Sequence, residues 1–206
     1  LRLVGSEMCI RDSHRIMREI ILPTVQGMTR DGIPYTGFLY AGLMIAPGDD
    51  PDRDIKTLEF NCRMGDPETQ PIMMRVKSDL LDVLEHAVDG TLDRADITWD
   101  RRTALGVVLA SHNYPNTPRT GDVIRGLPAD ADDCMVFHAA TELDGEDTKT
   151  TGGRVLCVTA LGDSVKMARD RVYEAIDGIH FDGRQYRSDI GWRALKPSQQ
   201  KPKSNA

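Results

Sequence analysis

The stretch EFNCRMGDPETQ, residues Glu59–Gln70, decides the fold assignment because it joins the end of a strand to the start of a helix. Its first residues complete the segment Ile55–Arg63, whose composition is typical of a β-strand. Side chains alternate between the two faces of a strand, so Glu59, Asn61 and Arg63 are predicted to share one face. That face would present a carboxylate, an amide and a guanidinium group together.

These residue types suit the binding of a phosphate-bound cation. Glu59 and Asn61 offer oxygen ligands, the type that Mg²⁺ prefers, and magnesium sites leave other positions to water and phosphate oxygens. Arg63 adds a planar fork that matches phosphate or carboxylate oxygens. Asp66 is a good cap for the following helix, whose first turn attracts anions. The alternative is a solvated strand face with a structural Glu59–Arg63 pair.

The residues around this stretch predict one layer of helices and a hairpin. Apolar residues at helical spacing predict a helix over about Ser13–Arg30, interrupted or kinked at Pro23. Thr36–Ala46 reads as a buried strand that forms a hairpin with Ile55–Arg63. An amphipathic helix is predicted from Asp66 to about Asp89, where Gly90 stops it.

The second half of the chain predicts a strand-rich module with one helix. The helix runs to about Ile179 after a cap at Asp163 or Ser164, with Val165, Ala168, Val172 and Ile176 on one face. The predicted fold class is therefore α+β. The expected strands are Thr103–Ser111, Asp122–Ile124, Met135–Ala139 and Arg154–Leu161, with an acidic hairpin between the last two.

Composition narrows the class of protein. The 206 residues are 40% hydrophobic and carry a formal net charge of −6, which argues against a nucleic-acid-binding protein. No apolar run approaches the ~18 residues that a membrane span requires. The four cysteines form no CxxC pair, so we expect reduced thiols. Since targeting and lipidation signals are absent from the sequence, we expect a cytoplasmic location.

The two ends of the chain differ in residue composition from the segment between them. Residues 1–13, LRLVGSEMCIRDS, resemble a translated adapter, and we predict that this leader is foreign to the natural chain. The polar, Pro-containing residues 196–206 are predicted to be a disordered tail. The candidate functional residues all lie between these two ends.

The motif around Arg63 resembles the signature of phosphoribosylamine–glycine ligases, members of the ATP-grasp superfamily. The family pattern R-F-G-D-P-E-x-Q is met at Arg63, Gly65, Asp66, Pro67, Glu68 and Gln70, with Met64 in place of Phe. The resemblance extends in order over nearly all of residues 14–195. It includes the segments Pro23–Met28, Tyr35–Ile45, Pro71–Leu81, Leu105–Ser111, Arg119–Pro128, Gly152–Gly162 and Asp189–Ala194.

The resemblance implies a reaction and a set of residue roles. ATP, glycine and 5-phosphoribosylamine would give glycinamide ribonucleotide, ADP and phosphate through a glycyl phosphate intermediate. Glu59 and Asn61 match the family's ligands for Mg²⁺ or Mn²⁺. We expect Arg63 to act in catalysis on the phosphoryl group or the glycine carboxylate, and Asp66 to contact the second substrate or to serve only as a cap.

The resemblance also implies a domain organisation. Residues 14–90 would be the C-terminal portion of an ATP-grasp domain, and residues 95–195 a small strand-rich α+β C-terminal domain. A family member is expected to be about twice as long, so we predict that this chain is a fragment and is inactive alone. We also expect a monomer without nucleic-acid or membrane partners. The alternative is a non-catalytic stand-alone module. One departure lies at His112-Asn113, where the family often has two glycines.

Overall fold

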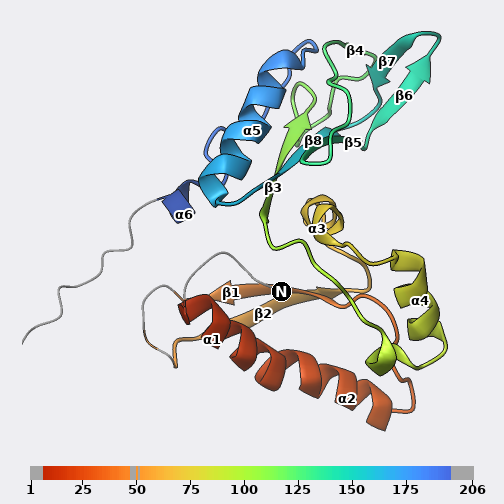
Figure 1. Ribbon diagram of the computed structural model, residues 1–206, viewed down its shortest axis with the longest axis vertical. Coiled ribbons are helices and arrows are strands. Elements are labelled where there is room, and N and C mark those ends of the chain that lie inside the picture. The colour runs from red at the N-terminus through yellow and green to blue at the C-terminus, as the bar shows by residue number, and fades with distance from the viewer. Residues whose placement is uncertain (1–6, 47–49, 51, 196–206) are drawn as a thin grey trace, which may run out of the picture. The chain divides into compact units, whose positions relative to one another are not determined.

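The computed structural model describes residues 7–46, 50 and 52–195 (Figure 1). The chain divides into two compact units, one ending at Asp100 and the other beginning at Arg101. Each unit is described by itself below. Among the described residues, no helix combines the length and apolar character that crossing a membrane requires.

The N-terminal unit begins with a continuous run of helix. Helix α1 (Glu7–Ile16) passes into a π-helical segment (Met17–Ile21) and then into α2 (Leu22–Arg30). The expected start near Ser13 was therefore wrong, since the helix starts at Glu7. Pro23 stands in the first turn of α2, directly after the widened π-helical segment, where a missing backbone N–H is tolerated.

A two-stranded antiparallel hairpin follows, as the sequence predicted. Strand β1 (Tyr40–Ile45) pairs with β2 (Ile55–Asn61), and the register shifts between Gly42 and Leu43. Both strands are shorter than the predicted segments. In particular, β2 ends at Asn61, two residues before the expected end at Arg63.

The single helix expected between Asp66 and Asp89 is instead two helices, α3 (Thr69–Arg75) and α4 (Leu80–Val88). Val76 is extended, with ψ at 122°, and forms an antiparallel bridge with Trp99. The neighbouring Lys77 N–H donates to the Thr98 carbonyl at 2.9 Å. This pairing with a later segment overrides the helical periodicity. Asp79 then caps α4 by accepting from the Leu81 N–H at 2.9 Å.

A short 3₁₀ turn (Leu92–Arg94) leads back to the segment that pairs with Val76. There Arg75 donates from Nε and Nη2 to the Asp100 carbonyl at 3.1 and 2.9 Å. The Asp100 N–H donates in return to the Arg75 carbonyl at 2.7 Å. These bonds fix the end of α3 to the last residue of the unit.

The C-terminal unit is built on two three-stranded antiparallel sheets (Figure 1). In the first sheet β8 (Arg154–Gly162) lies between β3 (Thr103–Ala110) and β5 (Cys134–His138). In the second sheet β7 (Asp147–Thr150) is central. Its neighbours are β4 (Val123–Ile124) and β6 (Thr141–Asp144). The four strands predicted here are all present, with ends within one residue of expectation, and the acidic hairpin is β6–β7.

Helix α5 (Val165–Gly178) packs on β3 and β8 and completes the core. Ser164 caps it as predicted, accepting from the Met167 N–H at 3.2 Å. Of the predicted apolar face, Ala168, Val172 and Ile176 are fully buried, and Val165 packs against them. The core residues contributed by the sheets include Leu105, Val107, Leu109, Val136, Val155, Leu156 and Val158.

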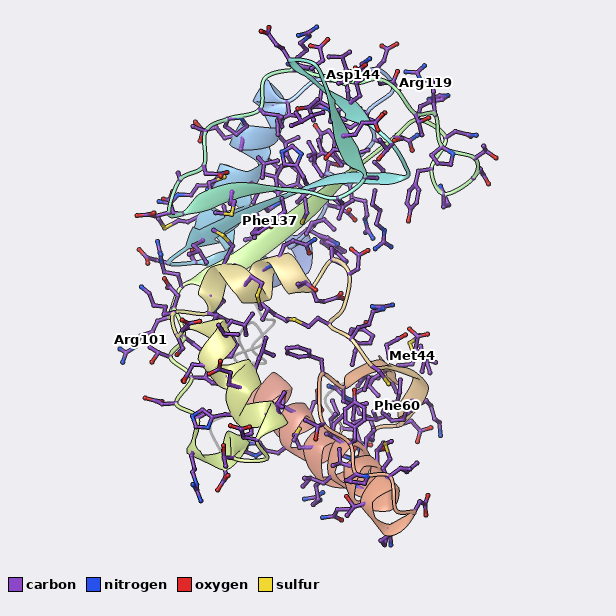
Figure 2. All side chains as sticks on the ribbon, turned by 90° about the vertical axis from the view of Figure 1, so that its right-hand side faces the viewer. Met44, Phe60, Arg101, Arg119, Phe137 and Asp144 are labelled. Atoms are coloured by element: carbon purple, nitrogen blue, oxygen red, sulfur yellow. The ribbon has the colours of Figure 1, made fainter. Side chains whose placement is uncertain are left out.

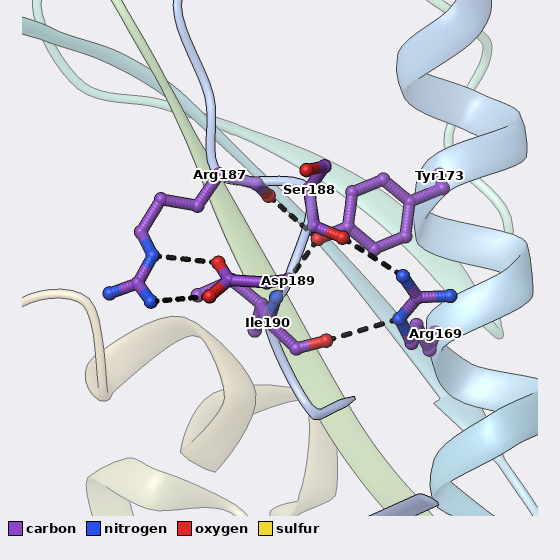
Figure 3. A network of polar contacts seen from close by, with 6 residues as sticks. All are labelled: Arg169, Tyr173, Arg187, Ser188, Asp189 and Ile190. Carbon is purple, nitrogen blue, oxygen red and sulfur yellow. Dashed lines mark hydrogen bonds and ion pairs between the residues drawn. The ribbon is translucent and has the colours of Figure 1, made fainter. Parts of the chain in front are cut away.

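A polar network anchors the segment after α5 to that helix (Figure 3). Arg169 donates to the carbonyls of Ser188 and Ile190 at 2.9 and 3.2 Å, and its guanidinium carbon lies 4.7 Å from the centre of the Tyr173 ring. The Tyr173 hydroxyl donates to the Arg187 carbonyl at 2.7 Å. The anchored segment ends in the short helix α6 (Trp192–Leu195). The predicted tail, 196–206, lies outside the described residues, as do residues 1–6 of the predicted leader.

The loop after β3 accommodates the departure from the family pattern without glycine. Asn113 adopts a positive φ of 70°, a conformation that asparagine tolerates better than most residues. Its amide nitrogen donates to the Thr117 carbonyl at 3.0 Å. Asn113 thus adopts a backbone conformation that glycine adopts most readily.

Candidate functional site

Glu59 and Asn61 lie on the same face of β2, as strand alternation predicted. Glu59 pairs with Gly42 of β1, and Asn61 pairs with Tyr40. The Glu59 Cγ lies 3.0 Å from the position that a Cβ on Gly42 would occupy. The missing side chain of Gly42 therefore makes room for the Glu59 side chain, which is exposed.

The Asn61 side chain is half-buried. Its Nδ2 is buried and has no hydrogen-bond partner among the described residues. Its side-chain oxygen is the atom that a hard cation would bind, and the role of Asn61 as a ligand stays a prediction.

Arg63 does not lie on the strand face as predicted, because β2 ends at Asn61 and the chain bends at Cys62 and Arg63. The Arg63 side chain is exposed, and its Nη1 donates to the neighbouring Met64 carbonyl at 3.0 Å. One local contact uses a single N–H of the guanidinium group, which has five N–H donors. The predicted grouping with Glu59 and Asn61 on one strand face was wrong, although the three residues remain close in the chain.

Asp66 is not a helix cap. It lies in a turn of three residues before α3, and its peptide bond to Pro67 is cis. The residue before the first turn of α3 is Glu68, whose side chain makes no capping bond. Instead, Thr69 donates to the Gly65 carbonyl from both its N–H and its Oγ1, at 3.0 and 2.6 Å. The exposed Asp66 carboxylate thus belongs to a turn fixed by its neighbours.

Gly65 and Tyr40 are structural parts of the site that the sequence did not reveal. Gly65 is buried, and a Cβ there would lie 2.7 Å from Tyr40 Cε2 and would also overlap the Glu68 carboxylate. Tyr40 is the pairing partner of Asn61. Its ring therefore connects the end of β2 to the turn that carries Asp66. The family pattern contains Gly65 and Glu68, but only the hairpin register brings Tyr40 to them.

One titratable group next to the site has a shifted pKa. Burial, together with a hydrogen bond to Cys62, raises the pKa of Tyr35 above its usual value. In the part of the chain that the structure describes, no three His, Cys, Asp or Glu side chains gather closely enough to hold a metal ion. Glu59 and Asn61 could thus supply only part of a coordination shell. Cys62, Cys134 and Cys157 are free thiols, as expected, and the Cys9 side chain lies outside the described part.

Family models match most of the chain in two segments. Residues 6–69 match the ATP-grasp (A) domain of phosphoribosylglycinamide synthetase, and residues 104–193 match its C domain. The chain is also 62% identical over 182 residues to a phosphoribosylamine–glycine ligase of Ralstonia nicotianae, which covers 88% of this chain. The chain belongs to the phosphoribosylamine–glycine ligase family. The match to the A domain ends inside the signature motif, at Thr69, and so contains Glu59 and Asn61.

Other members of the phosphoribosylamine–glycine ligase family are nearly as similar. The ligase of Xanthomonas axonopodis pv. citri is 54% identical over 187 residues, or 90% of this chain. This chain spans only 42% of the length of each of these two relatives. It therefore covers less than half of a family member.

Solved structures agree with the family assignment. The crystal structure of phosphoribosylamine–glycine ligase from Thermotoga maritima matches with a TM-score of 0.75 and 31% identity, covering 91% of this chain and 44% of that one. The biotin carboxylase domain of a thermophilic 2-oxoglutarate carboxylase matches with a TM-score of 0.53 at 13% identity, and shows a shared fold only. The roles of Glu59, Asn61, Arg63 and Asp66 stay predictions.

Proposed function

We propose that this chain is part of a ligase that joins glycine to 5-phosphoribosylamine at the expense of ATP. The observation that carries the proposal is the placement of Glu59 and Asn61 on one strand face within the segment that matches the family's ATP-grasp domain. Residues 14–90 would be the C-terminal portion of that domain, and residues 95–195 the C-terminal α+β domain. Residues 1–13 would be a leader foreign to the natural chain.

Glu59 and Asn61 fit a divalent cation shared with substrate phosphates. Each carries a side-chain oxygen on the same face of β2. Such a small protein contribution is typical of Mg²⁺ sites, and Mn²⁺ accepts the same ligands. When bound, Mg²⁺ or Mn²⁺ would neutralise charge on the phosphates of ATP.

In the proposed reaction, a carboxylate oxygen of glycine attacks the γ-phosphorus of ATP, and the bond from that phosphorus to the bridging oxygen breaks to release ADP. The amine of 5-phosphoribosylamine then attacks the carbonyl carbon of glycyl phosphate. An amide bond forms, the amine loses a proton, and inorganic phosphate leaves. Positioning and charge neutralisation are the main contributions that a protein makes to such transfers.

Arg63 and Asp66 would each bind a different reactant. The free donors of the exposed Arg63 guanidinium suit the transferring phosphoryl group or the glycine carboxylate. Asp66 is exposed and lies in a turn before α3, and its carboxylate suits the ribose hydroxyls or the amine of the second substrate. These roles place both residues on the substrate side of the site.

We infer that the 206 residues alone do not catalyse ligation, since they span 42% of the relatives' length. The partners would be small molecules only: ATP, glycine and 5-phosphoribosylamine. We further propose that the protein is a cytoplasmic monomer. An acidic chain with no membrane-spanning helix among its described residues is compatible with that location.

A chimera tests the proposed function. The portion of the Ralstonia nicotianae relative that has no counterpart here is fused to residues 14–206, and ADP release is followed with glycine and 5-phosphoribosylamine. We expect ligation by the chimera, with glycinamide ribonucleotide detected by mass, and none by the 206-residue chain. A chimera that folds but releases no ADP would favour the non-catalytic module. Ligation by the chain alone would contradict the requirement for the missing portion.

A further inference from the structure

Two amide side chains in the N-terminal unit have buried atoms without hydrogen-bond partners. They are the Asn61 Nδ2, a donor, and the Gln70 Oε1, an acceptor. Neither Asn61 nor Gln70 has a predicted role that uses these atoms. Buried polar atoms are nearly always paired in folded proteins because leaving one unpaired is costly, so both atoms require an explanation.

A chain of contacts leads from one amide to the other. Asn61 pairs with Tyr40 across the hairpin, and the Tyr40 ring lies against Gly65. The Gly65 carbonyl accepts two hydrogen bonds from Thr69, the residue before Gln70. Asn61, the last residue of β2, and Gln70, the second residue of α3, therefore flank the same turn. One carries an unused donor and the other an unused acceptor, so a single hydrogen bond would satisfy both.

We propose that Gln70 is a positioning residue for Asn61: its Oε1 accepts a hydrogen bond from the Asn61 Nδ2 and so holds the Asn61 Oδ1 toward the cation. The proposal deepens the proposed function and rests on the metal role of Asn61 given there. Gln70 itself touches neither the metal nor a substrate in this arrangement.

Residues that orient a metal ligand through a hydrogen bond strongly affect metal affinity. Gln70→Leu keeps the size of the side chain and removes the acceptor, whereas Gln70→Glu keeps an acceptor oxygen at the same reach. Gln26→Leu is a matched control, because Gln26 is an exposed glutamine on α2 of the same unit. Asn61→Ala removes the group on which Gln70 is proposed to act.

The first measurement uses the ¹⁵N-labelled 206-residue chain without metal. In Gln70→Leu, we expect the Asn61 side-chain amide protons to shift upfield and to exchange faster with water, since they lose their acceptor. In Gln26→Leu and Gln70→Glu they should stay near their wild-type behaviour. An Asn61 side-chain amide that does not respond to Gln70→Leu would overturn the proposal, whatever the metal result.

The second measurement is Mn²⁺ binding to the same chains, followed by the loss of the free-ion electron paramagnetic resonance signal. We expect Gln70→Leu to weaken Mn²⁺ binding about tenfold, and to have no further effect in the Asn61→Ala background. Equal weakening in both backgrounds would show that Gln70 acts independently of Asn61, and would overturn the proposal. A wild-type chain that binds no Mn²⁺ would count against the proposed metal role, and the amide resonances would still decide the pairing.

Discussion

The two units of this chain are similar in length but opposite in how they bury their residues. Of the residues described up to Asp100, only Gly65 and Asp100 are buried. From Arg101 onward, by contrast, β3, β8 and α5 enclose a continuous core that includes the fully buried Leu109, Leu156 and Ile176. The candidate ligands Glu59 and Asn61 lie on the unit that lacks a core of its own.

This difference teaches where the two units obtain their stability. In the N-terminal unit, Leu58, Met44 and Phe60 are 64%, 58% and 41% exposed, and the last two are labelled in Figure 2. An isolated two-stranded hairpin is marginally stable at best in water. We infer that β1 and β2 depend on further parts of the ligase for burial. The C-terminal unit, by contrast, has a buried apolar core of its own.

Removing a buried leucine from the C-terminal unit is expected to have the largest effect on stability. Leu109 is fully buried, so Leu109→Ala should lower the free energy of unfolding of that unit by about 2–5 kcal/mol. The matched change Leu58→Ala in β2 should alter the free energy of unfolding by less than about 0.5 kcal/mol. Urea unfolding followed by circular dichroism measures both. Equal losses would contradict the contrast between the units.

Gly65→Ala tests the turn in the N-terminal unit. A Cβ at this buried position meets the Tyr40 ring and the Glu68 carboxylate, so the turn must shift, at a cost of about 1–3 kcal/mol. In the chimera, ligation should fall on the order of 100-fold because Asp66 and Arg63 move with the turn.

Gly27→Ala is the control for this change. Gly27 lies in α2, and the nearest atom to a Cβ there is 3.9 Å away. Alanine should stabilise this helix by about 0.5–1 kcal/mol and leave ligation unchanged. If Gly65→Ala behaves like Gly27→Ala, the close contact with Tyr40 has no functional role.

Loss of a helix cap should have different consequences for stability in the two units. Ser164 caps α5 and Asp79 caps α4, and loss of either cap costs its helix about 1 kcal/mol. In the 206-residue chain, Ser164→Ala should lower the global unfolding free energy of the C-terminal unit by that amount. Asp79→Ala should speed hydrogen exchange in α4 alone. A global effect of Asp79→Ala would show that the units unfold together.

The smallest expected effect is a pH dependence within the C-terminal unit. A hydrogen bond from Lys149 lowers the pKa of Asp144 below its usual value. Its contribution to stability is therefore present above the ordinary carboxyl pKa and is lost as the pH falls through the lowered one. Asp144→Asn should be slightly less stable than wild type at pH 7, and the difference should shrink as the pH falls through the lowered pKa of Asp144. Urea unfolding at pH 7 and at acidic pH measures the difference.

The C-terminal unit could be predicted well because its signals are local. The apolar run of β8 and the spacing of Ala168, Val172 and Ile176 record burial directly. The alternation that put Glu59 and Asn61 on one face also held, since no bulge separates them. These predictions needed only strand and helix geometry.

The errors in the N-terminal unit come from contacts with distant segments. Nothing near Val76 indicates that Trp99 will pair with it and end α3, which is why the helix expected from Asp66 to Asp89 is divided. The end of β2 before Arg63 and the contact of Tyr40 with Gly65 likewise depend on the hairpin register. The unpaired amides of Asn61 and Gln70 are visible only in three dimensions.

The most direct test of the account is the rate of ADP release by the chimera when Glu59 is changed to Gln. This substitution keeps the shape of the side chain over Gly42 and removes only its charge. If Glu59 binds the cation that neutralises the phosphates of ATP, the rate should fall at least about 100-fold at fixed Mg²⁺. Glu142→Gln, a change at an exposed residue of β6, should leave the rate unchanged. A Glu59→Gln chimera as active as the Glu142→Gln control would contradict the account.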